Sequence, residues 1–104
     1  MTSGLRVGVL FGGRSSEHEV SILSASNVVK AIDAAKYEIM PIGIRRNGAW
    51  VVAELGPDGA LPSAVPDIGT EVSLLPGGNG RLIALPESGA PYELPRIDVL
   101  FPVL

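Results

Sequence analysis

The sequence contains no cysteine and a single histidine, His18. The lack of cysteine excludes a disulfide framework, a thiolate metal site and a cysteine nucleophile. One histidine is too few for the multi-histidine ligand sets of zinc sites. We therefore predict no metal site within these 104 residues.

Long apolar runs and strong charge are also missing. No stretch approaches the roughly 20 apolar residues that cross a bilayer, and the N-terminus lacks the pattern of a signal peptide. Charged residues make up 18% of the chain and the net charge is −3, so composition gives no sign of a nucleic-acid or membrane partner. These absences predict a soluble, cytoplasmic protein.

What the chain does contain is a series of apolar runs that predict an α/β fold. Valine- and leucine-rich runs predict strands, and apolar residues spaced three and four apart predict a helix between the first two. A strand–helix–strand crossover of this kind is almost always right-handed. The last run is apolar on both faces, which is typical of a buried parallel strand. The expected elements are strands at Leu5–Phe11, Tyr37–Ile44 and Asp98–Leu104 and a helix at Ser16–Ala35.

Turn-forming residues predict two hairpins and two loops between these elements. Asn47-Gly48 is a hairpin signal and would join strands within Pro41–Ile44 and Ala49–Val52. The glycine-rich stretch Pro76–Gly80 would join two short apolar arms, residues 72–75 and 81–85. The remaining segments, 54–70 and 86–95, are aperiodic and rich in proline and glycine, and are expected to be surface loops.

The most informative stretch, "GGRSSEHEVS", lies where the first strand turns into the helix. Ser16 and Glu19 have the spacing of a capping box, in which each side chain binds a backbone N–H of the other residue. That interpretation leaves Glu17 without a structural task. Glu17 then has two explanations: favourable interaction with the helix dipole, or binding of a cationic ligand at the carboxyl end of a parallel strand, where ligands of such folds bind.

The other polar residues of the turn allow further interpretations. His18 is either a solvated turn residue or a catalytic group. Arg14 and Ser15 could line an anion site together with helix N–H groups, although the two acids of the first turn argue against a phosphate there. The stretch matches neither the dinucleotide-binding nor the P-loop glycine motif.

The same stretch resembles the N-terminal segment of the D-alanine:D-alanine ligases, in which a strand leads into Gly-Gly-x-Ser-x-Glu-x-Glu-Val-Ser and a helix. "DVLFPVL" at 98–104 resembles the family's strand that precedes a His-Gly loop. Residues 54–95 carry little of this resemblance. The matching residues of the motif are Gly12, Gly13, Ser15, Glu17, Glu19, Val20 and Ser21.

The resemblance implies an ATP-grasp enzyme of three domains. Residues 1–104 would be its small N-terminal, pre-ATP-grasp, Rossmann-like α/β domain with hairpin insertions, truncated before the central and ATP-grasp domains. ATP and Mg²⁺ (or Mn²⁺) would bind outside this segment, which would be inactive alone. The partners implied are two molecules of D-alanine, the remaining domains of the same protein and a second copy in a homodimer.

The resemblance also implies a reaction and site residues. One D-alanine is phosphorylated on its carboxylate, the amine of a second attacks the acyl phosphate, and the dipeptide serves peptidoglycan synthesis. Glu17 falls on the family's glutamate that binds the ammonium of the first D-alanine. It is thus the expected catalytic and substrate-binding residue, with His18 and Ser21 as further substrate-binding candidates.

Two alternatives remain open at this point. The chain could be a non-catalytic α/β ligand-binding or interaction module that keeps the shape without the chemistry. A ligase that uses D-lactate or D-serine as its second substrate is compatible with the same motif.

Overall fold

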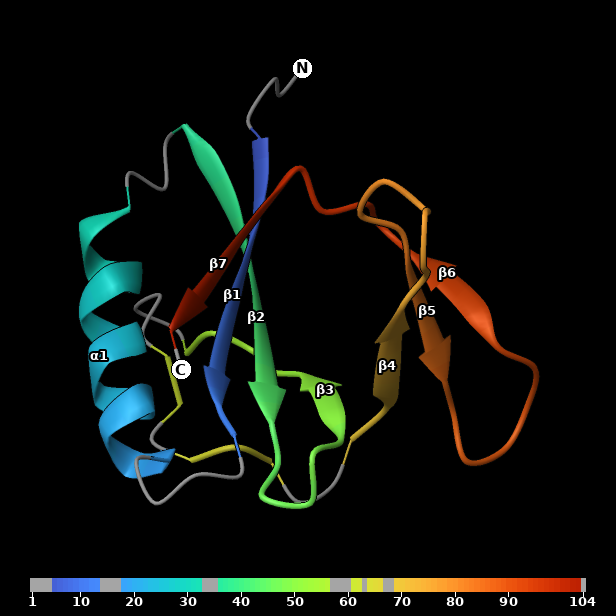
Figure 1. Cartoon of the computed structure of the whole chain (residues 1–104), viewed down its shortest axis with the longest axis horizontal. Coiled ribbons are helices and arrows are strands. Elements are labelled where there is room, and N and C mark those ends of the chain that lie inside the picture. The colour runs from blue at the N-terminus through green and yellow to red at the C-terminus, as the bar shows by residue number, and fades with distance from the viewer. Residues whose placement is uncertain are drawn as a thin grey trace.

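A computed structural model describes residues 5–13, 18–32, 36–56, 61–62, 64–66 and 69–103. Within these residues all the strands belong to one sheet, with the order β6-β5-β4-β3-β2-β1-β7. Figure 1 shows α1 at one side of the molecule and β4, β5 and β6 at the other. The elements are β1 (Leu5–Gly12), α1 (His18–Ala31), β2 (Tyr37–Ile44), β3 (Trp50–Val52), β4 (Glu71–Leu74), β5 (Leu82–Leu85), β6 (Tyr92–Leu94) and β7 (Val99–Val103).

The three parallel strands expected from the sequence are neighbours. β1 lies between β2 and β7 and runs parallel to both, with Leu10 opposite Ile42 on one side and Pro102 on the other. A valine- and leucine-rich strand suits this central position, because both of its faces are covered. The carboxyl ends of β1, β2 and β7 therefore lie along one edge of the sheet, next to the start of α1 (Figure 1).

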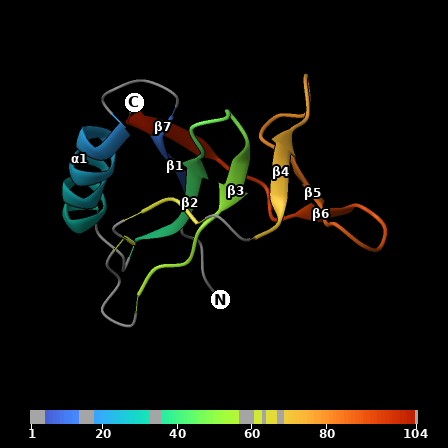
Figure 2. The ribbon, with the colours of Figure 1, turned by 90° about the horizontal axis from the view of Figure 1, so that it is seen from below.

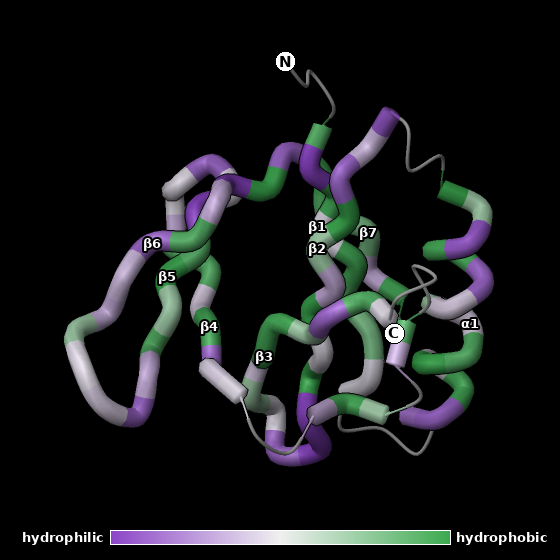
Figure 3. Tube along the Cα trace, turned by 180° about the vertical axis from the view of Figure 1, so that it is seen from behind, coloured by the Kyte–Doolittle hydropathy of each residue, from purple (hydrophilic) through white to green (hydrophobic). Residues whose placement is uncertain are grey.

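Helix α1 packs on one face of these strands, as predicted. Ile22, Ala25 and Val29 are buried in one cluster with Val7, Val9 and Phe11 of β1. Hydrophobic and hydrophilic positions alternate along α1 in Figure 3, as expected of a helix with one face in the core. Val20 and Leu23 belong to the apolar pattern of the sequence but are exposed. The expected helix residues 16–17 and 33–35 lie outside the described residues.

A second apolar cluster fills the other face of the sheet. Leu10, Ile42 and Ile44 pack there with Val72, Leu82, Ala84 and Ile97. Leu10 and its neighbours Val9 and Phe11 lie in different clusters, which follows from the alternation of side chains along a strand.

Both predicted hairpins are present. Ile42–Ile44 pairs with Trp50–Val52, and the turn between them closes through a bond from the Gly48 N–H to the Arg45 carbonyl oxygen at 2.8 Å. Gly48 has a φ of 92°, which explains the glycine. The second hairpin pairs β4 with β5 around residues 76–80. Figure 2 shows β4, β5 and β6 at the end of the sheet far from α1.

The expected loops are wrong in part. Residues 86–95 contain β6, whose Leu94 lies opposite Leu82 of β5. β6 consists of three residues between Pro91 and Pro95, which are too few for the alternating pattern that predicts a strand. In the segment 54–70, the described Leu61 is buried in the cluster beneath α1, so this segment is more than a surface loop.

The last strand also differs from expectation. β7 was expected to be buried on both faces, but Val99, Leu100 and Phe101 are 44%, 38% and 46% exposed. Its position explains this, because β7 is an edge strand of the sheet formed by the described residues. An edge position also tolerates Pro102, which lacks a backbone donor.

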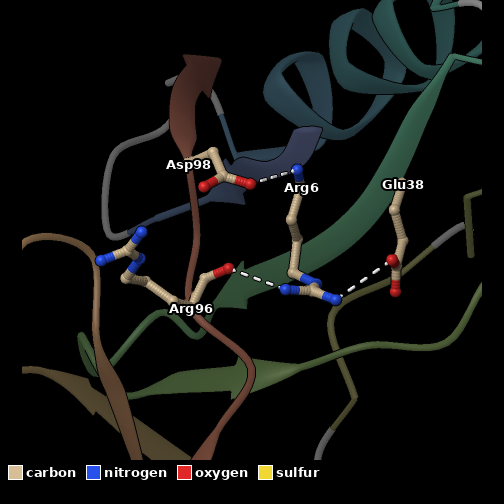
Figure 4. A network of polar contacts seen from close by, with 4 residues as sticks. All are labelled: Arg6, Glu38, Arg96 and Asp98. Carbon is tan, nitrogen blue, oxygen red and sulfur yellow. Dashed lines mark hydrogen bonds and ion pairs between the residues drawn. The ribbon is translucent and has the colours of Figure 1, made fainter. Parts of the chain in front are cut away.

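A polar network around Arg6 fixes the beginning of β7 against β1 (Figure 4). The Arg6 guanidinium donates to the Arg96 carbonyl oxygen at 2.9 Å and to the Glu38 carboxylate at 3.1 Å. The Arg6 backbone N–H donates to the Asp98 carboxylate at 2.7 Å, and the Asp98 N–H donates back to the Arg6 carbonyl oxygen. These bonds join β1, β2 and the entry to β7 at the edge opposite the strand-to-helix turn.

Candidate functional site

The turn after β1 begins with two glycines that no other residue could replace without strain. Gly12 and Gly13 have φ values of 91° and 106°, a region that side chains with a Cβ rarely adopt. A Cβ on Gly12 would lie 2.5 Å from the carbonyl oxygen of Ile44. The Gly13 N–H donates to that same oxygen at 2.8 Å, so the turn is held tightly against the end of β2.

Residues 14–17 lie outside the described residues. They include Glu17, the predicted substrate-binding residue, and Ser16, the predicted N-cap. The residues on both sides of this segment are described. Gly13 is bound to the end of β2, and His18 begins α1. The structure therefore defines where the chain enters and leaves the segment that carries Glu17.

His18 is buried at the start of α1, contrary to the interpretation of a solvated turn residue. Its side chain is 7% exposed. Nδ1 lies 2.6 Å from the carbonyl oxygen of Gly13, which requires the proton on Nδ1, since a carbonyl oxygen can only accept. His18 thus binds the last residue before the undescribed segment.

Ser21 links three elements at the same edge of the sheet. Its side chain is buried, and its Oγ accepts a hydrogen bond from the Gly12 N–H at 2.9 Å. The same hydroxyl donates to the carbonyl oxygen of Val103. Ser21 therefore joins α1 to the carboxyl ends of both β1 and β7.

Glu19 is exposed and pairs with Arg46 of the turn between β2 and β3. The hydrogen bond from Arg46 is the main reason that the pKa of Glu19 lies below the ordinary glutamate value. The Ser16 half of the predicted capping box lies outside the described residues. The structure shows Arg46 as a partner of Glu19, which the sequence did not predict.

The sequence did not predict two further residues of the site, Val65 and Arg46. Val65 lies close to Gly12 and Gly43, so that a Cβ on either glycine would come within 2.9 Å of its methyl groups. A glycine inside a strand, such as Gly43, signals close approach of another group. Arg46 belongs to the hairpin turn that was recognised, but its distant partner has no local signal, and Val65 lies in an aperiodic segment.

Other parts of the molecule offer less chemistry. One cavity, of about 600 Å³, is lined by Val52, Val72, Ala84, Tyr92 and Leu94 of β3 to β6 and by residues of the segment between β3 and β4, and none of its lining residues belongs to the glycine turn. We give the turn more weight, because it combines buried polar groups with the carboxyl ends of parallel strands. Among the described residues, no three acidic or histidine side chains are grouped to hold a metal ion, and no helix is long and apolar enough to cross a membrane.

Known proteins match this chain along its whole length. The family described as D-ala D-ala ligase N-terminus matches residues 6–104. D-alanine–D-alanine ligase A of Mesorhizobium japonicum is 54% identical over 107 residues, and the protein of the same name from Brucella suis biovar 1 is 52% identical over 105 residues. In both cases the match covers 100% of this chain and 29% of the relative.

Solved structures agree with the sequence relatives. The D-alanine-D-alanine ligase from Coxiella burnetii matches with a TM-score of 0.70 and 29% identity, over 98% of this chain and 29% of that one. The VanG D-Ala:D-Ser ligase from Enterococcus faecalis matches with a TM-score of 0.72 and 26% identity, over 96% of this chain and 29% of that one. The chain therefore spans less than a third of the length of these proteins.

Proposed function

Because this chain belongs to the D-alanine–D-alanine ligase family and matches its N-terminal domain, we propose that it forms part of the substrate pocket of an ATP-dependent ligase. The ligase joins two molecules of D-alanine into D-alanyl-D-alanine for peptidoglycan synthesis. The whole protein acts in the cytoplasm, as a homodimer, and the remaining domains supply the nucleotide site. We propose D-alanine, and not D-serine, as the second substrate, because relatives with 52% and 54% identity are named D-alanine–D-alanine ligases.

The observation that carries this proposal is the fixed turn after β1. Its glycines, His18 and Ser21 hold the chain on both sides of the segment that contains Glu17. This segment follows β1, the middle one of the three parallel strands β2, β1 and β7, at the edge of the sheet where ligands of such folds bind.

Glu17 supplies the charge in this proposal. Its carboxylate binds the ammonium of the first D-alanine and orients the molecule, so that the substrate carboxylate is held for phosphorylation. Orientation of this kind accounts for a large part of the rate of reactions between two bound groups. ATP, bound with Mg²⁺ or Mn²⁺ by the other domains, supplies the phosphoryl group, and phosphate leaves when the second amine attacks.

His18 and Ser21 support the pocket through hydrogen bonds to the backbone around the turn. The Ser21 hydroxyl is already engaged by Gly12 and Val103, and Nδ1 of His18 by Gly13. In this arrangement they contribute to substrate binding mainly by keeping the turn in place. Because Nδ1 of His18 is engaged by Gly13, Nε2 is the ring nitrogen available to a ligand.

The test is the substitution Glu17→Gln in the full-length enzyme. Glutamine keeps the shape and removes the charge, and a lost charge-assisted hydrogen bond costs about 1.5–3 kcal/mol. We expect kcat/KM for the first D-alanine to fall about ten- to a hundred-fold, with little change in Tm. The measurement is steady-state kinetics at varied D-alanine, fitted with two successive binding steps.

The matched control is Glu93→Gln. Glu93 is an exposed glutamate on β6, paired with Arg81 of the preceding chain segment and remote from the turn. This variant should keep the kinetics of the unmodified enzyme. Unchanged use of the first D-alanine in Glu17→Gln would show that the role assigned to Glu17 is wrong.

A further inference from the structure

The hairpin formed by β2 and β3 contacts the chain both before and after the segment that carries Glu17. Before it, the Gly13 N–H donates to the carbonyl oxygen of Ile44, at the end of β2. After it, the carboxylate of Glu19 pairs with Arg46, in the turn of the same hairpin. Ile44 and Arg46 are two residues apart, so a single turn holds both ends of this segment.

We propose that Arg46 is a positioning residue for substrate binding. It pairs with Glu19 in the first turn of α1 and so holds the helix start that directly follows Glu17, the residue proposed to bind the ammonium of the first D-alanine. The proposal rests on the proposed function, because it concerns how that same site is held in position.

The hairpin turn is well fixed, which separates this pair from an ordinary surface ion pair. The neighbouring Arg45 donates from Nε to the Pro66 carbonyl oxygen at 2.9 Å and pairs with Glu71 of β4 at 3.4 Å. Within the turn, the Gly48 N–H binds the Arg45 carbonyl oxygen, and the Asn47 side chain accepts from the Ala49 N–H at 2.9 Å. Arg46 therefore extends toward the helix from a turn that several hydrogen bonds hold in place.

The exposure of the pair limits its contribution to stability. The side chains of Arg46 and Glu19 are 55% and 74% exposed, and exposed pairs add little to folding free energy. A small displacement of a group that orients substrate, in contrast, has a large effect on rate. We therefore expect removal of Arg46 to change kinetics much more than Tm.

A second pair provides a matched control. Arg81 and Glu93 join the beginning of β5 to β6, with side chains 51% and 49% exposed. As with Glu19, the arginine lowers the pKa of the glutamate. The two pairs are alike in type and exposure, but only Arg46–Glu19 is next to the glycine turn.

The experiment uses the full-length ligase with the substitutions Arg46→Gln, Arg46→Lys, Glu19→Gln, the double variant R46Q/E19Q, and Arg81→Gln as control. We expect Arg46→Gln and Glu19→Gln each to lower kcat/KM for the first D-alanine roughly two- to five-fold, mainly through KM, because the free energy of an exposed pair limits the effect of its removal. The double variant should lose no more than either single one, because both remove the same contact. Arg46→Lys should restore part of the activity, and Arg81→Gln should match the unmodified enzyme.

The inference is wrong if Arg46→Gln behaves like Arg81→Gln, or if the effects of Arg46→Gln and Glu19→Gln multiply in the double variant. Failure of the proposed function looks different, because Glu17→Gln would then retain full use of the first D-alanine. An impaired Glu17→Gln together with an unimpaired Arg46→Gln overturns the role of Arg46 alone.

Discussion

Gly12 occupies a point where backbone conformation and space both require glycine. Its φ is 91°. A Cβ added at this position would lie only 2.5 Å from the carbonyl oxygen of Ile44. The same oxygen accepts the Gly13 N–H. The close approach of β1 to β2 at this point therefore sets the direction in which the chain leaves the sheet toward Glu17.

We expect Gly12→Ala to destabilise the full-length protein by more than the roughly 1–2 kcal/mol that an unfavourable positive φ costs a residue with a Cβ. The extra loss comes from displacement of the Ile44 carbonyl group. Gly89→Ala is the matched control, because Gly89 has a φ of 95° and nothing within 4 Å of an added Cβ. Denaturant unfolding measures both variants. Equal losses would contradict the close approach at Gly12.

At the scale of elements, the sequence predicted the helix and strands that have a local pattern and missed those that depend on distant contacts. β1 and β2 are long apolar runs, α1 has apolar residues at helical spacing, and the turn signal at Asn47-Gly48 specifies β3 as the partner of β2. β6 is too short to have a pattern, and the burial of Leu61 depends on a distant contact with the cluster beneath α1.

The candidate site shows the same division. The motif marked Gly12, Gly13 and Ser21, and His18 was a separate candidate; the structure brings these four residues together at one edge of the sheet. The motif could not show that Arg46 and Val65 complete this edge, because both arrive from turns and loops far along the chain. Local sequence specifies the glycine turn, whereas its surroundings depend on how the chain folds back.

Ser21 provides the prediction at this scale, because its hydroxyl joins α1, β1 and β7. Ser21→Ala should leave the Gly12 N–H and the Val103 carbonyl oxygen without that partner, at a cost of about 1–3 kcal/mol of unfolding free energy. Ser24→Ala on the exposed side of the same helix should be neutral or slightly stabilising, since alanine favours helix. Thermal or denaturant melts of both full-length variants are the measurement. A neutral Ser21→Ala would mean that the link contributes nothing to holding the strand ends.

For the molecule as a whole, the distribution of exposed apolar side chains is uneven. Val99, Leu100 and Phe101 are consecutive and exposed on β7, which pairs only with β1 among the described strands. Hydrogen bonds of the Arg6 network fix the beginning of this strand, and the Ser21 hydroxyl fixes its end. The outer edge of β7 thus combines a defined backbone with apolar side chains, and relatives of this chain are more than three times as long.

An exposed apolar edge strand promotes association with other chains. We therefore expect the 104-residue segment, expressed alone, to associate reversibly or to aggregate as its concentration rises. Phe101→Lys should reduce this association, because a charged residue on an edge strand opposes pairing with another strand. Tyr92→Lys is the control: Tyr92 is 51% exposed on β6, the strand at the opposite edge of the sheet. Sedimentation velocity over a range of concentrations distinguishes the variants. If the segment stays monomeric throughout, or if Tyr92→Lys suppresses association as well as Phe101→Lys does, the apolar edge of β7 is not the surface responsible.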